Sequence, residues 1–412
     1  MRKFSIILFT ALMMFSVASA QWVQRPNFPG VSRAKATSFT INGKIYVMGG
    51  VTNNSIILND FWEYDIATAT WTQKPNFPGP ERYGAVSFVL GNLGYIATGG
   101  NDFGYLDDMW QYDPTTGIWL QKTGLPVGSA QHENQRVEAF AFVIGNSVYL
   151  GGGQGFVFGA NSTNNIAFYD LWEFSTATNS WTPKATIPDF LGRNMSVAAA
   201  VNNKGYVGLG TDINQTVNRQ SFWEYDPVAD AWTMKADFPG NYTTDTGPFV
   251  LNNNIYITGG VRFSPIGTSG QFYRYDPVTD TWTQLPAFNG GAIVGHFTCA
   301  TATSAFAGGG YNGSFTTRND FWEYTTATGL NDHTPDNEAA AVFPNPTSGE
   351  LYIQSSKNIA SIQVTDPEGK IILNRTYKNG STDISEVQDG IYFVKIFFAD
   401  GETAVQRIVK AD

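Results

Sequence analysis

The sequence predicts an all-β protein in which six repeated units of four strands precede a small second domain of β-strands. Two aromatic residues recur nine positions apart, and each repeat contains a short apolar strand that ends in glycine. The 412 residues include 43 Gly, 30 Phe, 19 Tyr and 11 Trp but only 25 Lys and Arg. This composition suits short aromatic strands joined by tight turns rather than charged amphipathic helices.

The aromatic pairs and the glycines define the repeat. The pairs are Trp62/Trp71, Trp110/Trp119, Trp172/Trp181, Trp223/Trp232 and Tyr273/Trp282. The glycines that end the apolar strands lie in Gly49-Gly50, Gly99-Gly100, Gly152-Gly153, Leu209-Gly210, Gly259-Gly260 and Gly309-Gly310. Six units of about 50 residues result, which is a period typical of repeat proteins.

Each unit is expected to form one antiparallel sheet. In the first unit the expected strands are residues 36–41, 44–48, 60–65 and 70–74. Asn42-Gly43 predicts a hairpin turn between the first two, because glycine accepts a positive φ angle. The repeated Trp side chains would fill the wedge between neighbouring sheets, and the paired glycines would let backbones approach closely.

These motifs resemble the kelch repeat, in which one period of about 50 residues makes one blade of a β-propeller. The resemblance covers residues 22–324 and implies a six-bladed kelch β-propeller. The sixth unit lacks a second Trp after Trp322, whereas Trp22-Val23-Gln24 matches Trp71-Thr72-Gln73. The N-terminal strand is therefore expected to complete the last blade, which would leave no free sheet edge.

The first 20 residues predict a cleavable signal peptide. They begin with Arg2-Lys3, continue through an apolar run and end in the small-residue site Ala18-Ser19-Ala20. We expect no transmembrane anchor, because no later stretch approaches the roughly 20 apolar residues that cross a bilayer. Cys299 is the single cysteine, so no disulfide can form within the chain.

The C-terminal residues predict a separate export domain. The expected divisions are a signal peptide at 1–20, the propeller at 21–330, a linker at 331–341 and a small β-sandwich at 342–412. Segments of the last part resemble the type A sorting domain of the type IX secretion system, namely Phe343-Pro344-Asn345-Pro346-Thr347, Asp366-Pro367-Glu368-Gly369-Lys370, Gly390-Ile391-Tyr392 and Ile408-Val409-Lys410.

The sorting resemblance implies that the type IX secretion machinery is a partner. The domain would be removed during export, and the propeller would be secreted or held at the outer cell surface. An accessory sandwich that binds carbohydrate or protein is the alternative reading of the same residues.

Charge and motif content limit the other partners. The formal net charge is −10, and loss of Arg2 and Lys3 with the signal peptide makes it more negative, so nucleic acid is not an expected ligand. His132, His296 and His333 are the only histidines, and no spacing typical of a metal or cofactor site appears. We expect a monomer without metal or cofactor.

A ligand is expected at the long-loop face, which we define as the end of the propeller that carries the loops before the first strand and between the second and third strands of each blade. The opposite face would carry only tight turns. The longest of these loops, 153–170, contains Phe156 and Phe158, which are candidate ligand contacts. Long loops on a rigid frame are common binding sites.

Four arginines occupy matching places near the start of the innermost strands. They are Arg33, Arg82, Arg136 and Arg193. One interpretation is an arc around the central mouth that recognises an anionic or polyhydroxylated ligand. The other is that each arginine satisfies backbone carbonyls or pairs with a blade acid, the candidates being Asp60, Asp108, Asp170 and Asp320.

The third unit departs most from the repeat and supplies the candidates for catalysis. His132, Glu133 and Glu138 lie near the same mouth and would shuttle protons if they converged. A carbohydrate-active kelch enzyme, similar to sialic-acid epimerases or galactose oxidase, is therefore the alternative function. We expect instead a binding or adhesion module for an extracellular glycan or protein.

Overall fold

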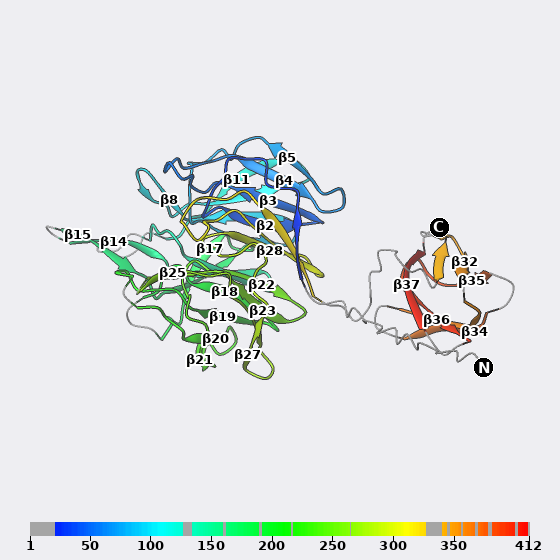
Figure 1. Ribbon diagram of the computed structural model, residues 1–412. Helices are drawn as coiled ribbons and strands as arrows, with labels where there is room; N and C mark the ends of the chain where they lie inside the picture. Colours follow the sequence, from blue (N-terminus) through cyan, green and yellow to red (C-terminus); the bar gives the residue numbers. More distant parts are fainter. Residues whose placement is uncertain are drawn as a thin grey trace, which may run out of the picture. The chain divides into compact units, whose positions relative to one another are not determined.

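The computed structural model describes residues 21–126, 134–159, 162–188, 192–215, 217–263, 265–326, 340–343, 347–355, 357–366, 370–377, 381–399 and 403–410. Two compact units are present, and Ala20–Thr326 makes up the larger one (Figure 1). The expected signal peptide and nearly all of the expected linker lie outside the described residues. No described segment forms a helix with the length and apolarity needed to cross a membrane.

Six antiparallel four-stranded sheets form the blades of the larger unit (Figure 1). Blade one contains β2 (Thr37–Ile41), β3 (Lys44–Met48), β4 (Phe61–Asp65) and β5 (Thr70–Lys74); blade two contains β6 (Val86–Leu90), β7 (Leu93–Ala97), β10 (Met109–Asp113) and β11 (Ile118–Lys122). Blade three contains β12 (Phe140–Ile144), β13 (Ser147–Gly151), β16 (Leu171–Ser175) and β17 (Ser180–Lys184); blade four contains β18 (Val197–Val201), β19 (Lys204–Gly208), β20 (Phe222–Asp226) and β21 (Ala231–Lys235). Blade five contains β22 (Gly247–Leu251), β23 (Asn254–Thr258), β26 (Phe272–Asp276) and β27 (Thr281–Leu285); blade six contains β28 (Phe297–Ala300), β29 (Ser304–Gly308), β30 (Phe321–Thr325) and β1 (Gln21–Arg25).

The first strand of each blade lies innermost. These strands contact one another in the closed cycle β2, β6, β12, β18, β22 and β28. Three blades also carry a short hairpin on the loop between their second and third strands: β8 (Gly100–Asn101) with β9 (Gly104–Tyr105), β14 (Gln154–Gly159) with β15 (Ser162–Ala167), and β24 (Val261–Phe263) with β25 (Ile266–Thr268). The sequence did not predict these hairpins.

The N-terminal strand closes the propeller, as predicted. β1 pairs antiparallel with β30, and Trp22 lies opposite Tyr324 just as Trp71 lies opposite Tyr64 in blade one. The Trp22 side chain is 4% exposed, and its ring centroid lies 5.0 Å from that of Phe288. β1 forms one sheet with β28, β29 and β30, so residues about 300 positions apart in the sequence share a core.

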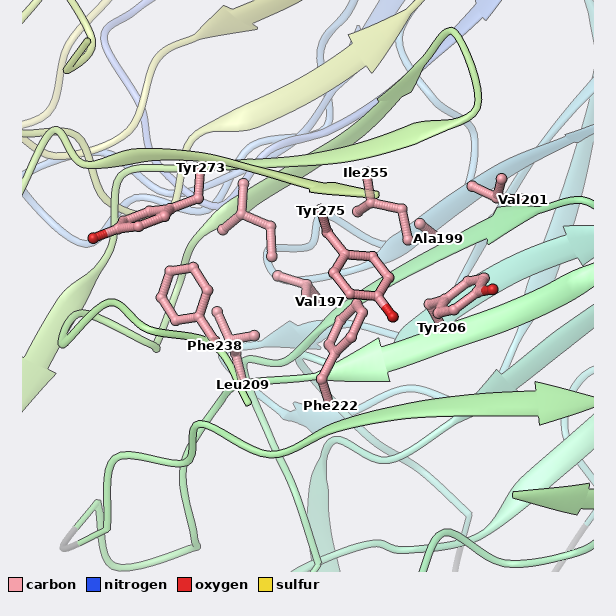
Figure 2. Close-up of a cluster of buried hydrophobic side chains, with 11 residues drawn as sticks. Val197, Ala199, Val201, Tyr206, Leu209, Phe222, Phe238, Ile255, Tyr273 and Tyr275 are labelled. Carbon is pink, nitrogen blue, oxygen red and sulfur yellow. The ribbon is translucent and has the colours of Figure 1, made fainter. Parts of the chain in front are cut away.

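The wedges between blades are filled by buried Phe and Tyr side chains together with the repeated Trp, whose rings pack on the neighbouring blade: the centroid of Trp119 lies 5.2 Å from that of Phe61, and that of Trp282 lies 5.1 Å from that of Phe222. Figure 2 shows one such core, where Tyr206 and Phe222 of blade four meet Tyr275 of blade five. The repeated tryptophans are only half-buried; the indole N–H of Trp71, for example, donates to the carbonyl of Pro26 at 3.1 Å. Burial of an aromatic side chain of roughly 200 Å² contributes a few kcal/mol, so each wedge stabilises its blade pair substantially.

The paired glycines allow blades to approach closely. Gly49 and Gly50 have φ angles of +67° and +96°, and a Cβ atom on Gly49 would lie 2.6 Å from the carbonyl oxygen of Arg82 in the next blade. The Gly50 N–H donates to that same oxygen at 2.8 Å. In blade two Thr98 and Gly99 take these two places, so the pair begins one residue earlier than Gly99-Gly100 suggested.

The smaller unit is a β-sandwich of two antiparallel sheets. One sheet has the order β31 (Ala340–Phe343), β32 (Glu350–Ser355), β35 (Ser381–Asp383), and the other has the order β34 (Ile371–Thr376), β33 (Ile359–Thr365), β36 (Gly390–Phe398), β37 (Thr403–Lys410). A common core joins Leu351 of the first sheet to Ile362 and Val394 of the second. β31 and β35 were not predicted, and β31 begins inside the segment expected to be linker.

Candidate functional site

Each repeated arginine lies inside its own blade, in a fixed set of contacts. Arg33 is fully buried, and its guanidinium donates to the Asp60 carboxylate at 2.7 Å and to the Gly49 carbonyl at 3.0 Å. The indole N–H of Trp62 donates to the same carboxylate at 2.7 Å. The guanidinium also stacks on Phe28, 4.6 Å from the ring centroid. These hydrogen bonds of Arg33 are thus directed into the blade.

The same arrangement recurs around the propeller. Its members are Arg82 with Asp108 and Trp110, and Arg136 with Asp170 and Trp172. In blade six a similar cluster is formed by Arg318, from the loop before the third strand, with Asp320 and Trp322. In blade four Arg193 donates to the Ser221 hydroxyl at 2.8 Å and to the Leu209 carbonyl at 2.8 Å. Removing one partner from a buried ion pair costs about 3–5 kcal/mol. Ligand recognition by these guanidinium groups would have to break such pairs, which favours the structural interpretation.

The other predicted site residues lie in different surroundings. His132 and Glu133 lie outside the described residues. Phe156 is half-buried and stacks on Tyr105 of blade two, with 4.7 Å between ring centroids. Phe158 lies in β14, but its side chain falls outside the described part. Glu138 alone among the catalytic candidates is fully described, and it lies on the propeller axis.

Glu138 belongs to a closed ring of six residues, one from each blade, which we call the axial ring. Its members are Lys35, Gly84, Glu138, Met195, Asp245 and Gly295, and each precedes the innermost strand of its blade by two residues. Each backbone N–H donates to the carbonyl of the preceding member, and the N···O distances run from 2.6 to 3.4 Å around the full circle. The backbone therefore encircles the axis with one continuous set of hydrogen bonds.

All six residues of the axial ring have positive φ angles, between 51° and 59°. Glycine occupies two of these positions, which is the residue that this conformation favours. A side chain in the left-handed region costs roughly 1–2 kcal/mol, and the ring nevertheless holds Lys35, Glu138 and Asp245 there. Met195 shares this conformation, so the closed circle of backbone hydrogen bonds holds it at charged and uncharged residues alike.

The three charged side chains converge from alternate blades. The Lys35 ammonium forms an ion pair with Glu138, and its Nζ lies 3.4 Å from Oδ2 of Asp245. The side chains of Lys35, Glu138 and Asp245 are 16%, 7% and 14% exposed. One largely buried cation thus faces two carboxylates, of which Glu138 is buried and Asp245 largely so, which leaves one net negative charge at the axis.

Burial shifts the ionisation of this cluster. Burial raises the pKa of Glu138 to about 6, against the opposing attraction of the Lys35 ammonium. Burial alone would lower the pKa of Lys35, but the carboxylates of Asp245 and Glu138 reverse this and raise it. Glu138 can therefore exchange a proton near neutral pH while Lys35 stays charged.

A cavity of about 130 Å³ opens beside the cluster. It is lined by the axial ring and by the residues that follow it, which include Ser196, Thr246 and His296. Within the described part of the chain, no partner is found for Glu138 Oε2, the Ser196 and Thr246 hydroxyls, or either ring nitrogen of His296. Burial, aided by the nearby Arg318 charge, lowers the pKa of His296 to about 3, so its imidazole is neutral. Unsatisfied buried polar groups are costly and mark a place for water or ligand.

The size and donors of the cavity limit its chemistry. About 130 Å³ is below the about 300–1,000 Å³ of pockets that bind drug-sized ligands. Among the described residues, no three His, Cys, Asp or Glu side chains converge in a way that would hold a metal ion. The cavity can thus hold a small polar group and offer it the proton of Glu138.

Sequence reasoning did not identify Lys35 and Asp245. The repeated arginines that the sequence singled out lie two residues before the axial ring. At the axial-ring position itself, the first four units have Lys35, Gly84, Glu138 and Met195. The change of charge at one repeated position was the available signal.

The long-loop face carries a second feature, exposed apolar side chains on the loops between second and third strands. They are Ile56, Phe103, Val217, Ile266 and Phe315, from five different blades, and we call them the loop-tip residues. Phe103 is 92% exposed. Tyr169, also exposed, lies in the corresponding loop of blade three.

Family comparisons agree with this architecture. A model described as the KLHDC2/KLHL20/DRC7 Kelch-repeats domain matches residues 7–153, and a Kelch motif model matches residues 243–289. A model described as the secretion system C-terminal sorting domain matches residues 341–411. The larger unit is thus a β-propeller whose sequence matches kelch-repeat models over part of its length, and the smaller unit matches a secretion system C-terminal sorting domain.

Comparison with solved structures supports the same fold. The chain resembles the protein described as "Structure of YjhT" with a TM-score of 0.58 and 15% sequence identity, over 72% of this chain and 96% of that one. At this identity the likeness shows the propeller fold alone. No curated protein matches the sequence.

Proposed function

We propose that this protein is an exported binding or adhesion module whose long-loop face takes an extracellular glycan or protein. The observation that carries the proposal is the set of loop-tip residues, which places an exposed apolar side chain on the same kind of loop in five of the six blades. Exposed apolar groups that form a patch on one face of a soluble domain are typical of interaction sites.

The blade-two loop that carries Phe103 is braced by contacts with blade three. Phe156 of the β14–β15 hairpin stacks on Tyr105, whose hydroxyl accepts a hydrogen bond from the Gln154 amide at 2.9 Å. The amide of Asn194 in blade four donates to Gln154 at 2.8 Å. Loops held in place before binding lose less conformational entropy when a partner docks.

The sorting domain supports an address outside the cell, either released or attached to the surface, after removal of the signal peptide and the C-terminal domain. A chain ending at residue 326 is expected to fold and to remain in the periplasm, because it lacks the domain that the secretion machinery would recognise. Fractionation and immunoblotting measure this. Its appearance in the medium would contradict the export part of the proposal.

The alternative, a carbohydrate-active enzyme, is favoured by one observation, the buried Glu138 whose pKa lies near 6. Two properties of the axial cavity weigh against it: the volume is below that of typical ligand pockets, and the net negative charge would repel sialic or uronic acids. NMR screening of the wild-type chain against acidic sugars should show no anomer exchange, epimer formation or elimination. Turnover that Glu138→Gln abolishes would establish the enzyme instead.

A glycan and protein array probed with the full mature chain tests the binding proposal. We expect saturable capture of at least one ligand class, which competition with soluble ligand should reverse. A protein that binds nothing on either array, while remaining folded by circular dichroism, would contradict it.

A further inference from the structure

We propose that the axial cavity is a binding site for a primary ammonium group, on a small amine or on a chain end that reaches the axis. The site is formed by Glu138, Asp245, Ser196 and Thr246 beside the Lys35 ammonium. This inference goes beyond the proposed function, because the loop-tip residues can bind a partner whether or not the cavity is filled.

The charge of the cluster selects a cation. Lys35 neutralises one of the two carboxylates, and the neutral His296 adds no charge, so a single negative charge remains. Arg318, whose charge acts on His296, is already paired with Asp320. A bound monocation would bring the site to neutrality, whereas an anion would double the imbalance.

The hydrogen-bonding groups select an ammonium among cations. A primary ammonium has three N–H donors and no acceptor. Three oxygen atoms of residues that line the cavity have no partner within the described residues: Glu138 Oε2, Ser196 Oγ and Thr246 Oγ1. With the acceptor nitrogen of the neutral His296, which also has no partner there, they are enough for all three donors of the ligand, and buried polar groups are normally satisfied in this way.

The cavity is small and open to solvent, at about 130 Å³. It can therefore take the ammonium group itself, while a longer ligand would extend out of it. A quaternary ammonium has no N–H donor and would leave all three oxygens unsatisfied.

Binding should depend on pH through Glu138. The charged and titratable groups that face it are Lys35 and Asp245, with Tyr83, Tyr311 and His296 around them. The tyrosines and Lys35 keep their protons at neutral pH, since their pKa values are raised, and His296 stays neutral. Protonation of Glu138 below about pH 6 would remove both the net charge and one acceptor.

Titration of the full mature chain with methylammonium chloride, followed by ¹H–¹⁵N NMR at constant ionic strength, tests the proposal. We expect saturable shifts of the axial-ring amides at pH 7.5, and at least a tenfold weaker affinity at pH 5. Tetramethylammonium and potassium chloride should give no saturable shift. Equal shifts with potassium, or no shift with methylammonium, would overturn the proposal.

Variants give the second arm of the test. Glu138→Gln should weaken methylammonium binding at least tenfold, and Ser196→Ala, which changes no charge, should weaken it several-fold. Glu63→Gln is the matched control, because Glu63 pairs with Lys44 in blade one and does not line the cavity. If Glu138→Gln fails to fold, Ser196→Ala decides. Unchanged affinity in Ser196→Ala and in every folded Glu138 variant would also overturn the proposal.

Discussion

Two positions only two residues apart in the repeat behave in opposite ways. At the first, blades one to four all have arginine, and each side chain is buried in its own blade against an acid or hydroxyl. At the second, the same blades have Lys35, Gly84, Glu138 and Met195, and the charged members meet across the axis. Repetition thus marks the frame of the propeller, and variation at a repeated place marks where its symmetry is broken.

The largest expected effect concerns the frame. Deletion of residues 21–25 removes β1 and Trp22 from the last blade, and we expect the free energy of unfolding to fall by more than the ~3–5 kcal/mol typical of losing one buried tryptophan. Urea denaturation followed by tryptophan fluorescence measures it. Trp22→Phe, which keeps an aromatic ring in the wedge, should lose much less. A deletion that leaves the unfolding midpoint unchanged would contradict closure by β1.

The frame could be predicted from the sequence because its signals are local and periodic. Glycine pairs, aromatic spacing and the unpaired Trp22 each follow from the geometry of one blade, and together they predict the blade number and its closure. The glycine pair of blade two was predicted one residue too late, because Thr98 has a positive φ angle and occupies the position that glycine fills in blade one.

The axial site could not be predicted in the same way. Lys35 and Asp245 are over 200 residues apart, and only closure of the propeller brings their side chains together. The positive φ angles and the circular hydrogen bonds of the axial ring are likewise properties of six blades together. The cation–carboxylate cluster therefore has no signature within one repeat.

The second effect tests whether the repeated arginines are structural. Arg82→Met should lower the free energy of unfolding by about 3–5 kcal/mol, because it leaves the Asp108 carboxylate without its guanidinium partner. Arg25→Met is the control, since Arg25 is 41% exposed and its ion pair with Glu323 should be worth at most about 1 kcal/mol. Equal losses of unfolding free energy in the two variants, measured by chemical denaturation, would show that the buried pair stabilises the fold no more than the exposed pair.

The third effect concerns the axial ring. Glu138 holds its proton more tightly when folded, with a pKa of about 6 against an ordinary value of 4.5, so its contribution favours folding below pH 4.5 and is lost as the pH rises through 6. This amounts to on the order of 2 kcal/mol. Denaturation of wild type and Glu138→Gln between pH 4.5 and 7.5 should show that the difference between their stabilities changes by that amount. A constant difference would contradict the raised pKa.

The smallest effect on stability is expected at the loop-tip residues, where surface substitutions change the free energy of unfolding by at most ~0.5 kcal/mol. Their effect should instead appear in binding, and a matched pair of double variants separates the two faces. Phe103→Ser/Ile266→Ser alters the long-loop face. Val228→Ser/Val278→Ser alters equally exposed residues, 94% and 83% accessible, in the turns between third and fourth strands on the opposite face.

The dissociation constants of these two variants for the ligand captured on the array test the account most directly. We predict at least a tenfold weaker affinity for Phe103→Ser/Ile266→Ser, because two apolar contacts are lost, and an affinity within twofold of wild type for Val228→Ser/Val278→Ser. The opposite pattern, in which the turn variant loses the ligand and the loop variant keeps it, would contradict the assignment of the long-loop face as the binding surface.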